Sequence, residues 1–261
     1  MEVRLLRIDP EFLAEMAVEE RKFFLVAGAL LNEINTLNKV HVASAQNDEP
    51  DAICSLANGL QSMFFARLLA GKLFEFGEFL RKSYWSAAHF QARIRKQLHP
   101  DATAALARLQ KNLARNRSLA NVRNWFSFHY SADKAEENWK EASAHAQFYL
   151  VLGGTVENNF YSVGELVLNW GVLKEFHEDD AITAVQSFFR LIDGMLRDAT
   201  LFLEGVLIVI LCSRVGKDLG ELTTVERIFP KTRLSEARLP YFYATETGDH
   251  DHQRPGACGD D

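Results

Sequence analysis

The sequence predicts an all-α protein, a helical bundle with long antiparallel helices and an additional helix towards the C-terminus. Apolar residues recur at threes and fours along most of the chain, the spacing that places them on one face of a helix. No alternation of apolar and polar residues persists for six positions within the first 150, and the 261 residues include only 15 Gly and 6 Pro. We therefore expect one helical domain over residues 1–215.

Two long helices are expected first. Asp9-Pro10-Glu11 favours a helix start, because Asp accepts bonds from first-turn amides and Pro fits the first helical position. This helix breaks at residues 47–51, and a second helix covers about residues 51–82. The residues expected to face the core are Phe12, Met16, Phe23, Val26, Leu30, Ile34 and Leu37 in the first helix and Ile53, Leu56, Leu60, Phe64, Leu68, Phe76 and Leu80 in the second.

Pro and Gly divide the rest of the chain. A shorter helix is expected after Pro100, and residues 155–178 show no clear pattern. The last strong helix begins at Asp179-Asp180, where acids suit a helix N-terminus. Two further helices are expected over residues 113–129 and 132–152, an irregular C-terminal extension over 216–243 and a disordered tail over 244–261. The last helix should turn Ile182, Val185, Phe189, Ile192, Leu196, Phe202, Val206 and Ile210 towards the core.

Composition and charge exclude several classes of protein. A chain with 48% hydrophobic and 25% charged residues is neither disordered nor fibrous, and a net charge of −6 argues against nonspecific coating of nucleic acid. Three scattered cysteines are too few for a disulfide framework, so we expect a reducing compartment, the cytoplasm. The N-terminus lacks the pattern of a signal peptide, and the most apolar stretch, residues 205–212, is far shorter than a membrane span of about 20 residues. We expect no membrane association.

Common catalytic and metal motifs are absent from the sequence. It contains no glycine-rich phosphate loop, no His-Glu-x-x-His and no Cys-x-x-Cys. Asp249-His250-Asp251-His252 and Cys258 have the chemistry of metal ligands, but they lie in the glycine-rich tail, where no packing is expected to fix their geometry. We expect neither a metal site nor a cofactor.

Charge is distributed unevenly along the chain. Between Arg93 and Tyr130 there are eight basic residues and one acid, Asp101, so this segment carries +7 and the rest of the chain carries −13. Two interpretations are open. The basic residues form a surface that binds phosphate groups, with Arg115, Arg117 and Tyr130 as candidates for substrate contacts, or they pair with acidic helices such as those with Glu136-Glu137 or Asp179-Asp180.

The same segment holds the residues best suited to phosphodiester chemistry. Arg123 supplies a guanidinium that binds two phosphate oxygens at once, His129 an imidazole that moves protons near neutral pH, and Asn124 an amide that orients either of them. On a regular helix Arg123 and His129 would be about 240° apart with roughly 9 Å of rise between them. Either the helix breaks before His129, or two copies of the chain supply facing residues.

The run Arg123-Asn124-Trp125-Phe126-Ser127-Phe128-His129 resembles the Arg-polar-x4-His signature of the HEPN superfamily. The stretch at residues 70–75 has the general look of such proteins, and the two long helices extend the likeness to about the first 150 residues. The resemblance implies a dimeric helical bundle that cleaves RNA without a metal, as a toxin or in phage defence, with an antitoxin or regulatory protein as a further partner. It implies that Arg123, Asn124 and His129 are catalytic.

In the implied mechanism, His129 acts on the 2′-hydroxyl or the leaving oxygen, and Arg123 neutralises charge that develops on the phosphate. The products carry a 2′,3′-cyclic phosphate. The alternative is a noncatalytic helical module for dimerisation or partner binding, in which Arg123 forms a surface ion pair and His129 ends a helix. Trp125, Phe126 and Phe128 either stack on bases or, as the abundance of Phe favours, pack in the core.

Overall fold

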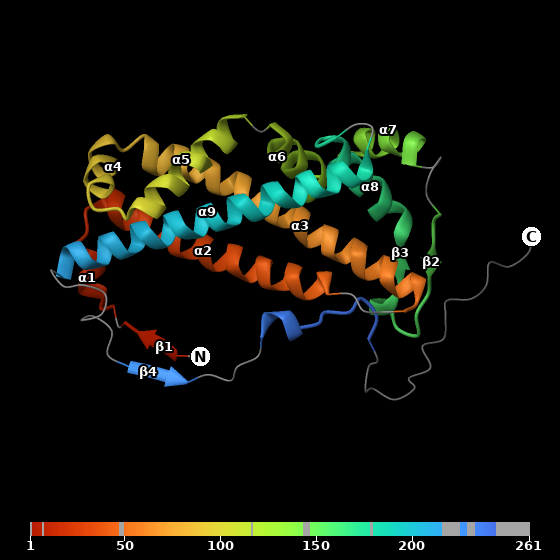
Figure 1. Ribbon diagram of the computed structural model, residues 1–261, viewed down its shortest axis with the longest axis horizontal. Helices are drawn as coiled ribbons and strands as arrows, with labels where there is room; N and C mark the ends of the chain where they lie inside the picture. The colour runs from red at the N-terminus through yellow and green to blue at the C-terminus, as the bar shows by residue number, and fades with distance from the viewer. Residues whose placement is uncertain are drawn as a thin grey trace, which may run out of the picture.

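The all-α helical bundle is confirmed by the computed structural model (Figure 1). Its three long helices are α2 (Val18–Ala45), α3 (Ala52–Leu80) and α9 (Ala181–Val215), and α2 and α3 run in opposite directions side by side. The residues that the structure describes are 2–6, 8–46, 50–115, 117–142, 147–177, 180–215, 225–228 and 233–243.

The first expected helix is divided in two. Pro10 begins α1 (Pro10–Ala14) as predicted, but the Asp9 side chain makes no capping bond, and α2 begins only at Val18. Arg21 explains the break, because its Nη1 donates to the carbonyl oxygens of Leu13 and Ala14 at 3.3 Å each and so caps the end of α1. The chain turns there, and Met16 is buried at the turn.

The second helix begins where the sequence predicts. The Asp51 carboxylate accepts hydrogen bonds from the amides of Ile53 at 2.9 Å and Cys54 at 2.8 Å, as an N-cap does. At its other end α3 continues without a break into a π-helical turn, η1 (Arg81–Trp85). A short helix, α4 (Ala88–Arg95), then leads to α5 (Pro100–Arg115), the helix expected after Pro100.

Three expectations for the middle of the chain are corrected. The helix expected over 113–129 is α6 (Arg117–Asn121) followed by a π-helical turn, η2 (Val122–Ser127), and it ends before His129. The helix expected over 132–152 is α7 (Ala132–Ala142), and Leu150 and Val151 lie in a strand instead. The stretch without a clear pattern contains a 3-10 turn, η3 (Val156–Asn158), and a helix, α8 (Ser162–Lys174).

Two short antiparallel sheets accompany the helices. Strand β1 (Glu2–Leu5) pairs with β4 (Val225–Ile228) in the register Glu2 to Ile228, and β2 (Leu150–Val151) pairs with β3 (Phe160–Tyr161). After the 3-10 turn η4 (Leu234–Glu236), the Leu239 amide donates to the Ala43 carbonyl at 3.2 Å. The domain boundaries at 215 and 243 stay a prediction, and the expected disordered tail lies outside the described residues.

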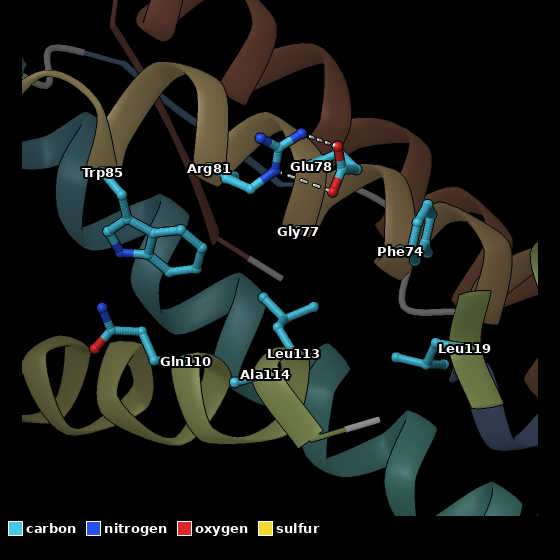
Figure 2. Close-up of a pocket in the computed structure, with 9 residues that line it drawn as sticks. All are labelled: Phe74, Gly77, Glu78, Arg81, Trp85, Gln110, Leu113, Ala114 and Leu119. Carbon is cyan, nitrogen blue, oxygen red and sulfur yellow. Dashed lines mark hydrogen bonds and ion pairs between the residues drawn. The ribbon is translucent and has the colours of Figure 1, made fainter. Parts of the chain in front are cut away.

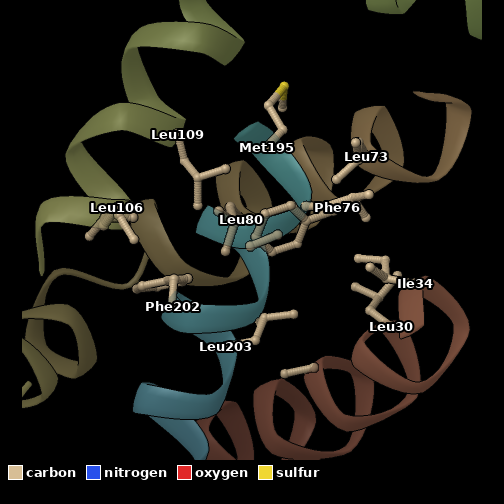
Figure 3. Close-up of a cluster of buried hydrophobic side chains, with 14 of the residues drawn as sticks. Leu30, Ile34, Leu73, Phe76, Leu80, Leu106, Leu109, Met195, Phe202 and Leu203 are labelled. Atoms are coloured by element: carbon tan, nitrogen blue, oxygen red, sulfur yellow. The ribbon is translucent and has the colours of Figure 1, made fainter. Parts of the chain in front are cut away.

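The core lies where α2, α3, α5 and α9 meet. Figure 3 shows side chains from all four helices converging on the buried face of α3. Two residues expected to face the core are exposed instead, since Val26 is 44% exposed on α2 and Ile182 is 71% exposed in the first turn of α9. The labelled core residues are Leu30, Ile34, Leu73, Phe76, Leu80, Leu106, Leu109, Met195, Phe202 and Leu203.

Helix α3 is long and rich in apolar residues. Among the described residues, Ala52–Trp85 is the one helical segment long and apolar enough to cross a membrane by length and composition, and its most apolar 18-residue stretch has a mean hydropathy of 1.2. Its place in the bundle accounts for that composition, because Leu69, Leu73 and Phe76 are fully buried beneath the neighbouring helices. Its length and hydropathy are therefore weak grounds for a membrane span, and the absence of membrane association stays a prediction.

One buried histidine should make the stability of the fold depend on pH. His41 of α2 stacks on Phe189 of α9, and its Nδ1 lies 3.2 Å from the Ser62 carbonyl oxygen. Burial lowers the pKa of His41 below its usual 6.5, although the Ser62 carbonyl and Asp193 oppose the shift. Because the unfolded chain then binds this proton more readily than the folded one, the free energy of unfolding should fall as the pH drops below about 6.5.

We therefore predict that urea denaturation at pH 7.5 and 5.5 gives a smaller free energy of unfolding at the lower pH, and that His41→Gln reduces this difference. His89→Gln, which alters an exposed imidazole, is the matched control and should leave the difference unchanged. An equal loss of stability at pH 5.5 in the wild type and in His41→Gln would show that another group is responsible.

Candidate functional site

The π-helical turn η2 positions the Arg123 motif. In this turn the Phe128 amide donates to the Arg123 carbonyl, five residues earlier, at 3.2 Å. The turn is anchored by buried Val122 and Phe126, and the Ser127 hydroxyl donates to the Arg67 carbonyl of α3 at 2.8 Å. The helix thus breaks before His129, which is one of the two arrangements that the spacing of the motif requires.

A glycine of α3 allows the chain to end its helix at this point. Gly71 is buried, and a Cβ on it would lie only 2.5 Å from Cε2 of Phe128. The Phe128 ring occupies the space that any other residue at position 71 would fill. Two aromatic residues of the motif thus differ in their surroundings. Phe126 is a core residue, whereas Phe128 packs on Gly71 and keeps 42% of its surface exposed.

Arg123 is held by two neighbours. Its Nε donates to Glu75 Oε1 at 2.8 Å, its Nη2 lies 2.7 Å from the same oxygen, and its Nη1 donates to Asn124 Oδ1 at 2.9 Å. The guanidinium carbon is 6.0 Å from the centre of the Phe74 ring. These contacts fix the direction of the guanidinium, and Glu75 compensates its charge.

Glu75 is the site residue that sequence reasoning missed. It lies in the stretch at residues 70–75, which contributes to the HEPN resemblance, but the spacing of the Arg123 motif does not predict a role for Glu75. A signal was present, because Glu75 and Glu78 are the only acids in α3, an otherwise strongly apolar helix. Acids are rare in such a helix unless they are paired, as Glu75 is with Arg123 and Glu78 with Arg81.

Arg123 lines an open cavity of about 490 Å³ between α2, α3 and η2. The cavity also contains a second cation, Lys72, whose Nζ pairs with Glu33 Oε2 at 2.7 Å. The other polar residue in its wall is Glu75, and Phe128 forms part of its apolar side. Two cations therefore lie in the wall of one surface cavity, each paired with a carboxylate.

His129 lies outside this cavity. It follows the end of η2, its side chain is exposed, and it makes no hydrogen bond or ion pair with the residues that the structure describes. Tyr130 beside it is 63% exposed. A single copy of the chain thus joins Arg123 to Asn124 but leaves His129 as a solvent-facing imidazole next to the cavity wall formed by Phe128.

Of the two candidate substrate-binding arginines, the structure describes the side chain of Arg117 alone. Arg117 begins α6 and is exposed, and Arg115 ends α5, where its side chain lies outside the described part of the structure. Arg117 is not among the described residues that line the cavity of Arg123. Their role as substrate contacts stays a prediction.

Much of the basic segment is paired inside the bundle. Arg108 forms a bidentate ion pair with buried Asp198 of α9, at 2.7–3.0 Å, and this hydrogen bonding raises the pKa of Arg108. Arg93 binds Glu20 of α2 at 3.0 Å. With the pair formed by Arg123, three basic residues of the segment have acidic partners among the described side chains, and these partners differ from those suggested by the sequence. The side chains of Arg95, Lys96, Lys111 and Arg117 are exposed.

A second pocket has Phe74, the ring that Arg123 approaches, in its wall. Figure 2 shows it between α3 with η1 and α5 with α6, with Phe74 and Leu119 at one end, Trp85 at the other and Leu113 between them. Its volume is about 380 Å³. The buried Trp85 Nε1 has no hydrogen-bond acceptor among the described residues. A pocket with aromatic rings in its wall therefore lies near Arg123.

Neither a cluster of metal ligands nor a comparison with known proteins points to a function. Within the described ranges, no group of three or more His, Cys, Asp or Glu side chains is arranged to hold a metal ion, and residues 249–258 lie outside those ranges. Comparison with family models, curated proteins and solved structures found no match.

We predict that Gly71→Ala and Gly59→Ala, two substitutions in the same helix, differ in their effect on the free energy of unfolding. Gly59 is exposed and has nothing near its missing Cβ, so Gly59→Ala should raise the free energy of unfolding by about 0.5–1 kcal/mol through helix propensity. Gly71→Ala gains the same propensity but must displace Phe128, so its stability should fall about 1 kcal/mol or more below that of Gly59→Ala. Urea denaturation measures both, and equal gains would refute the close packing of Phe128.

Proposed function

We propose that the chain is a HEPN-like, metal-independent endoribonuclease that cleaves RNA phosphodiester bonds in a toxin or phage-defence setting. The observation that carries the proposal is the placement of Arg123. Glu75 and Asn124 hold its guanidinium in a cavity that also contains a second cation. The helix that carries Arg123 ends nearby and leaves the His129 imidazole in solvent. A guanidinium can bind phosphate oxygens, and an exposed imidazole can transfer protons near neutral pH.

The contacts of Arg123 leave part of its donor set for a phosphate. A guanidinium has five N–H donors, and its bonds to Glu75 and Asn124 occupy three of them. One N–H remains on each of Nη1 and Nη2, and both are available to donate to phosphate oxygens. Lys72 adds positive charge to the same cavity and would favour entry of the anion.

In the proposed reaction, His129 removes the proton of the 2′-hydroxyl, and the resulting oxygen attacks phosphorus and releases the 5′-oxygen, which takes up a proton from solvent. Arg123 compensates the charge that builds on the phosphate oxygens, and Asn124 holds Arg123 in place. The balanced products are an RNA with a 2′,3′-cyclic phosphate and an RNA with a 5′-hydroxyl. No metal or other cofactor takes part in this scheme.

A homodimer would complete the site. Within one copy His129 does not line the cavity of Arg123, so the catalytic imidazole is supplied across an interface between two copies. Leu25 and Val26 of α2, 53% and 44% exposed, form an apolar surface with Phe128, and Val26 and Phe128 both line the cavity. An antitoxin or regulatory protein that covered this surface would block both the interface and the site.

The enzyme proposal predicts that His129→Ala and Arg123→Ala each lower the rate of single-stranded RNA cleavage by about 10²–10⁴-fold in the presence of a chelator. His89→Ala removes another exposed imidazole and should leave the rate unchanged. Gel analysis of a labelled oligonucleotide gives the rates. Equal cleavage by all variants, or none by the wild type, would contradict the proposal.

The proposed interface is tested separately. Val26→Glu places a carboxylate on the apolar surface beside Glu75 and should shift the protein to monomer in analytical ultracentrifugation, with loss of cleavage. Ile182→Glu is the matched control, because Ile182 is even more exposed and lies at the start of α9. An unchanged sedimentation coefficient for Val26→Glu would place the interface elsewhere or show that the protein is a monomer.

A noncatalytic dimerisation or partner-binding module is the second candidate. It is favoured by the charge balance of the cavity, in which Glu75 neutralises Arg123 and Glu33 neutralises Lys72. Under this alternative His129→Ala leaves dimerisation and partner binding intact and alters stability at most. The RNA cleavage assay therefore separates the two candidates.

A further inference from the structure

One face of the long helix α9 is exposed to solvent. Helices α2, α3 and α5 pack against its other sides as it runs along the bundle (Figure 1). On the remaining face, exposed or half-exposed residues recur at threes and fours, and at 100° per residue they lie within about 80° of each other. The members of this α9 stripe are Arg190, Gly194, Arg197, Leu201, Glu204 and Ile208.

The stripe carries charges that the rest of the chain does not use. Arg197 and Glu204 are exposed, and neither makes an ion pair or hydrogen bond with the described residues. They lie about 10 Å apart along the helix, beyond the three- or four-residue spacing at which helical ion pairs form. Other arginines, Arg93, Arg108 and Arg214, all bind acids of other helices. The stripe therefore offers charges of both signs to a partner from outside the chain.

The apolar part of the stripe has a simple relief. Leu201 and Ile208 are 38% and 39% exposed and lie about two turns apart. Two turns before Leu201, Gly194 has no side chain, and no described neighbour lies within 4 Å of the place where its Cβ would be. The stripe thus has a projection at Ile208 and a hollow at Gly194, equally far from Leu201.

This order of residues complements itself when two α9 helices run in opposite directions. With Leu201 facing Leu201 of the second copy, Ile208 faces the hollow at Gly194, and Arg197 lies within one residue of facing Glu204. In a parallel pair Arg197 would face Arg197 instead, and like charges repel. Charge therefore selects a second copy of the chain in the antiparallel arrangement.

We propose that the α9 stripe is a second homotypic interface, through which two copies of the chain associate about a two-fold axis at Leu201. The symmetry repeats each contact, so the interface has two ion pairs between Arg197 and Glu204 and two contacts of Ile208 with Gly194. Helices that pack side by side lie about 8–10 Å apart, a distance at which these side chains meet.

Association through the stripe is weak. Specific interfaces below about 1,200 Å² are transient, and a stripe with two large apolar side chains belongs to that class, so we expect a Kd of about 0.1–1 mM. At low micromolar concentration this interface is dissociated. The inference does not depend on the proposed function, because the stripe shares no residue with the surface of Leu25, Val26 and Phe128. At high local concentration the two surfaces together would link copies into assemblies larger than a dimer.

Sedimentation velocity of the Val26→Glu protein tests the interface, because this background removes association through the α2 surface. Its sedimentation coefficient should rise between about 10 µM and about 1 mM, the range that spans the expected Kd. Arg197→Glu should weaken association about 10-fold or more, and adding Glu204→Arg should restore it. Arg190→Glu makes the same change in net charge at a position with no acid opposite, so it is the matched control.

Three results would overturn the proposal. The first is a sedimentation coefficient that does not rise with concentration. The second is equal association of the Arg197→Glu and Arg190→Glu variants, and the third is a failure of Glu204→Arg to restore the association lost in Arg197→Glu. Each reads association rather than cleavage, so it is distinguishable from a failure of the proposed function.

A cross-link locates the axis. Helices about 8–10 Å apart bring position 201 of both copies within the range of a disulfide, so mild oxidation of Leu201→Cys should give a dimer joined at that position in mass spectrometry. Arg190→Cys is the control, because its two copies would lie about 33 Å apart. Both variants carry Cys258→Ser so that this thiol takes no part. Equal cross-linking of the two variants, or none in Leu201→Cys, would refute the antiparallel interface.

Discussion

The close packing of Phe128 on Gly71 is the contact on which the arrangement of the motif depends. Helix α3 is buried on most sides, and at Gly71 it leaves the one space that the Phe128 ring occupies. With Phe128 held there, η2 closes its last turn on the Arg123 carbonyl, and the helix ends at Ser127. Arg123 then faces Glu75 on α3, and His129 leaves the bundle. A packing constraint on the surface of α3 thus sets the geometry of the candidate site.

The central position of α3 also explains how charge is arranged. The sequence separates a basic segment from an acidic remainder, but folding brings three of those basic residues onto acids of α2, α3 and α9. These pairs join elements far apart in the chain, as Arg108 and Asp198 show. Part of the basic segment therefore joins helices of the bundle, and a phosphate at Arg123 must bind beside a carboxylate that is already present.

The sequence predicts the helices well, because helix formation depends on residues that are close together in the chain. The three long helices, the start of α3 near residue 51 and the start of α5 at Pro100 follow from apolar spacing and from residues near in sequence. The break between α1 and α2 was not predicted, because it depends on Arg21 reaching back to two carbonyls. The partnership of Glu75 with Arg123 and the separation of His129 from the cavity depend on contacts between distant segments, which no spacing rule contains. The HEPN resemblance itself stays a prediction.

The chemistry of the RNA ends tests the central claim most directly, because it reports on the attacking group as well as on cleavage. Purified wild-type protein is incubated with single-stranded RNA and a chelator, and the product ends are identified by mass spectrometry. The account predicts 2′,3′-cyclic phosphate and 5′-hydroxyl ends, as attack by the 2′-oxygen requires. Ends with a 3′-hydroxyl and a 5′-phosphate, or no cleavage in the chelator, would contradict it.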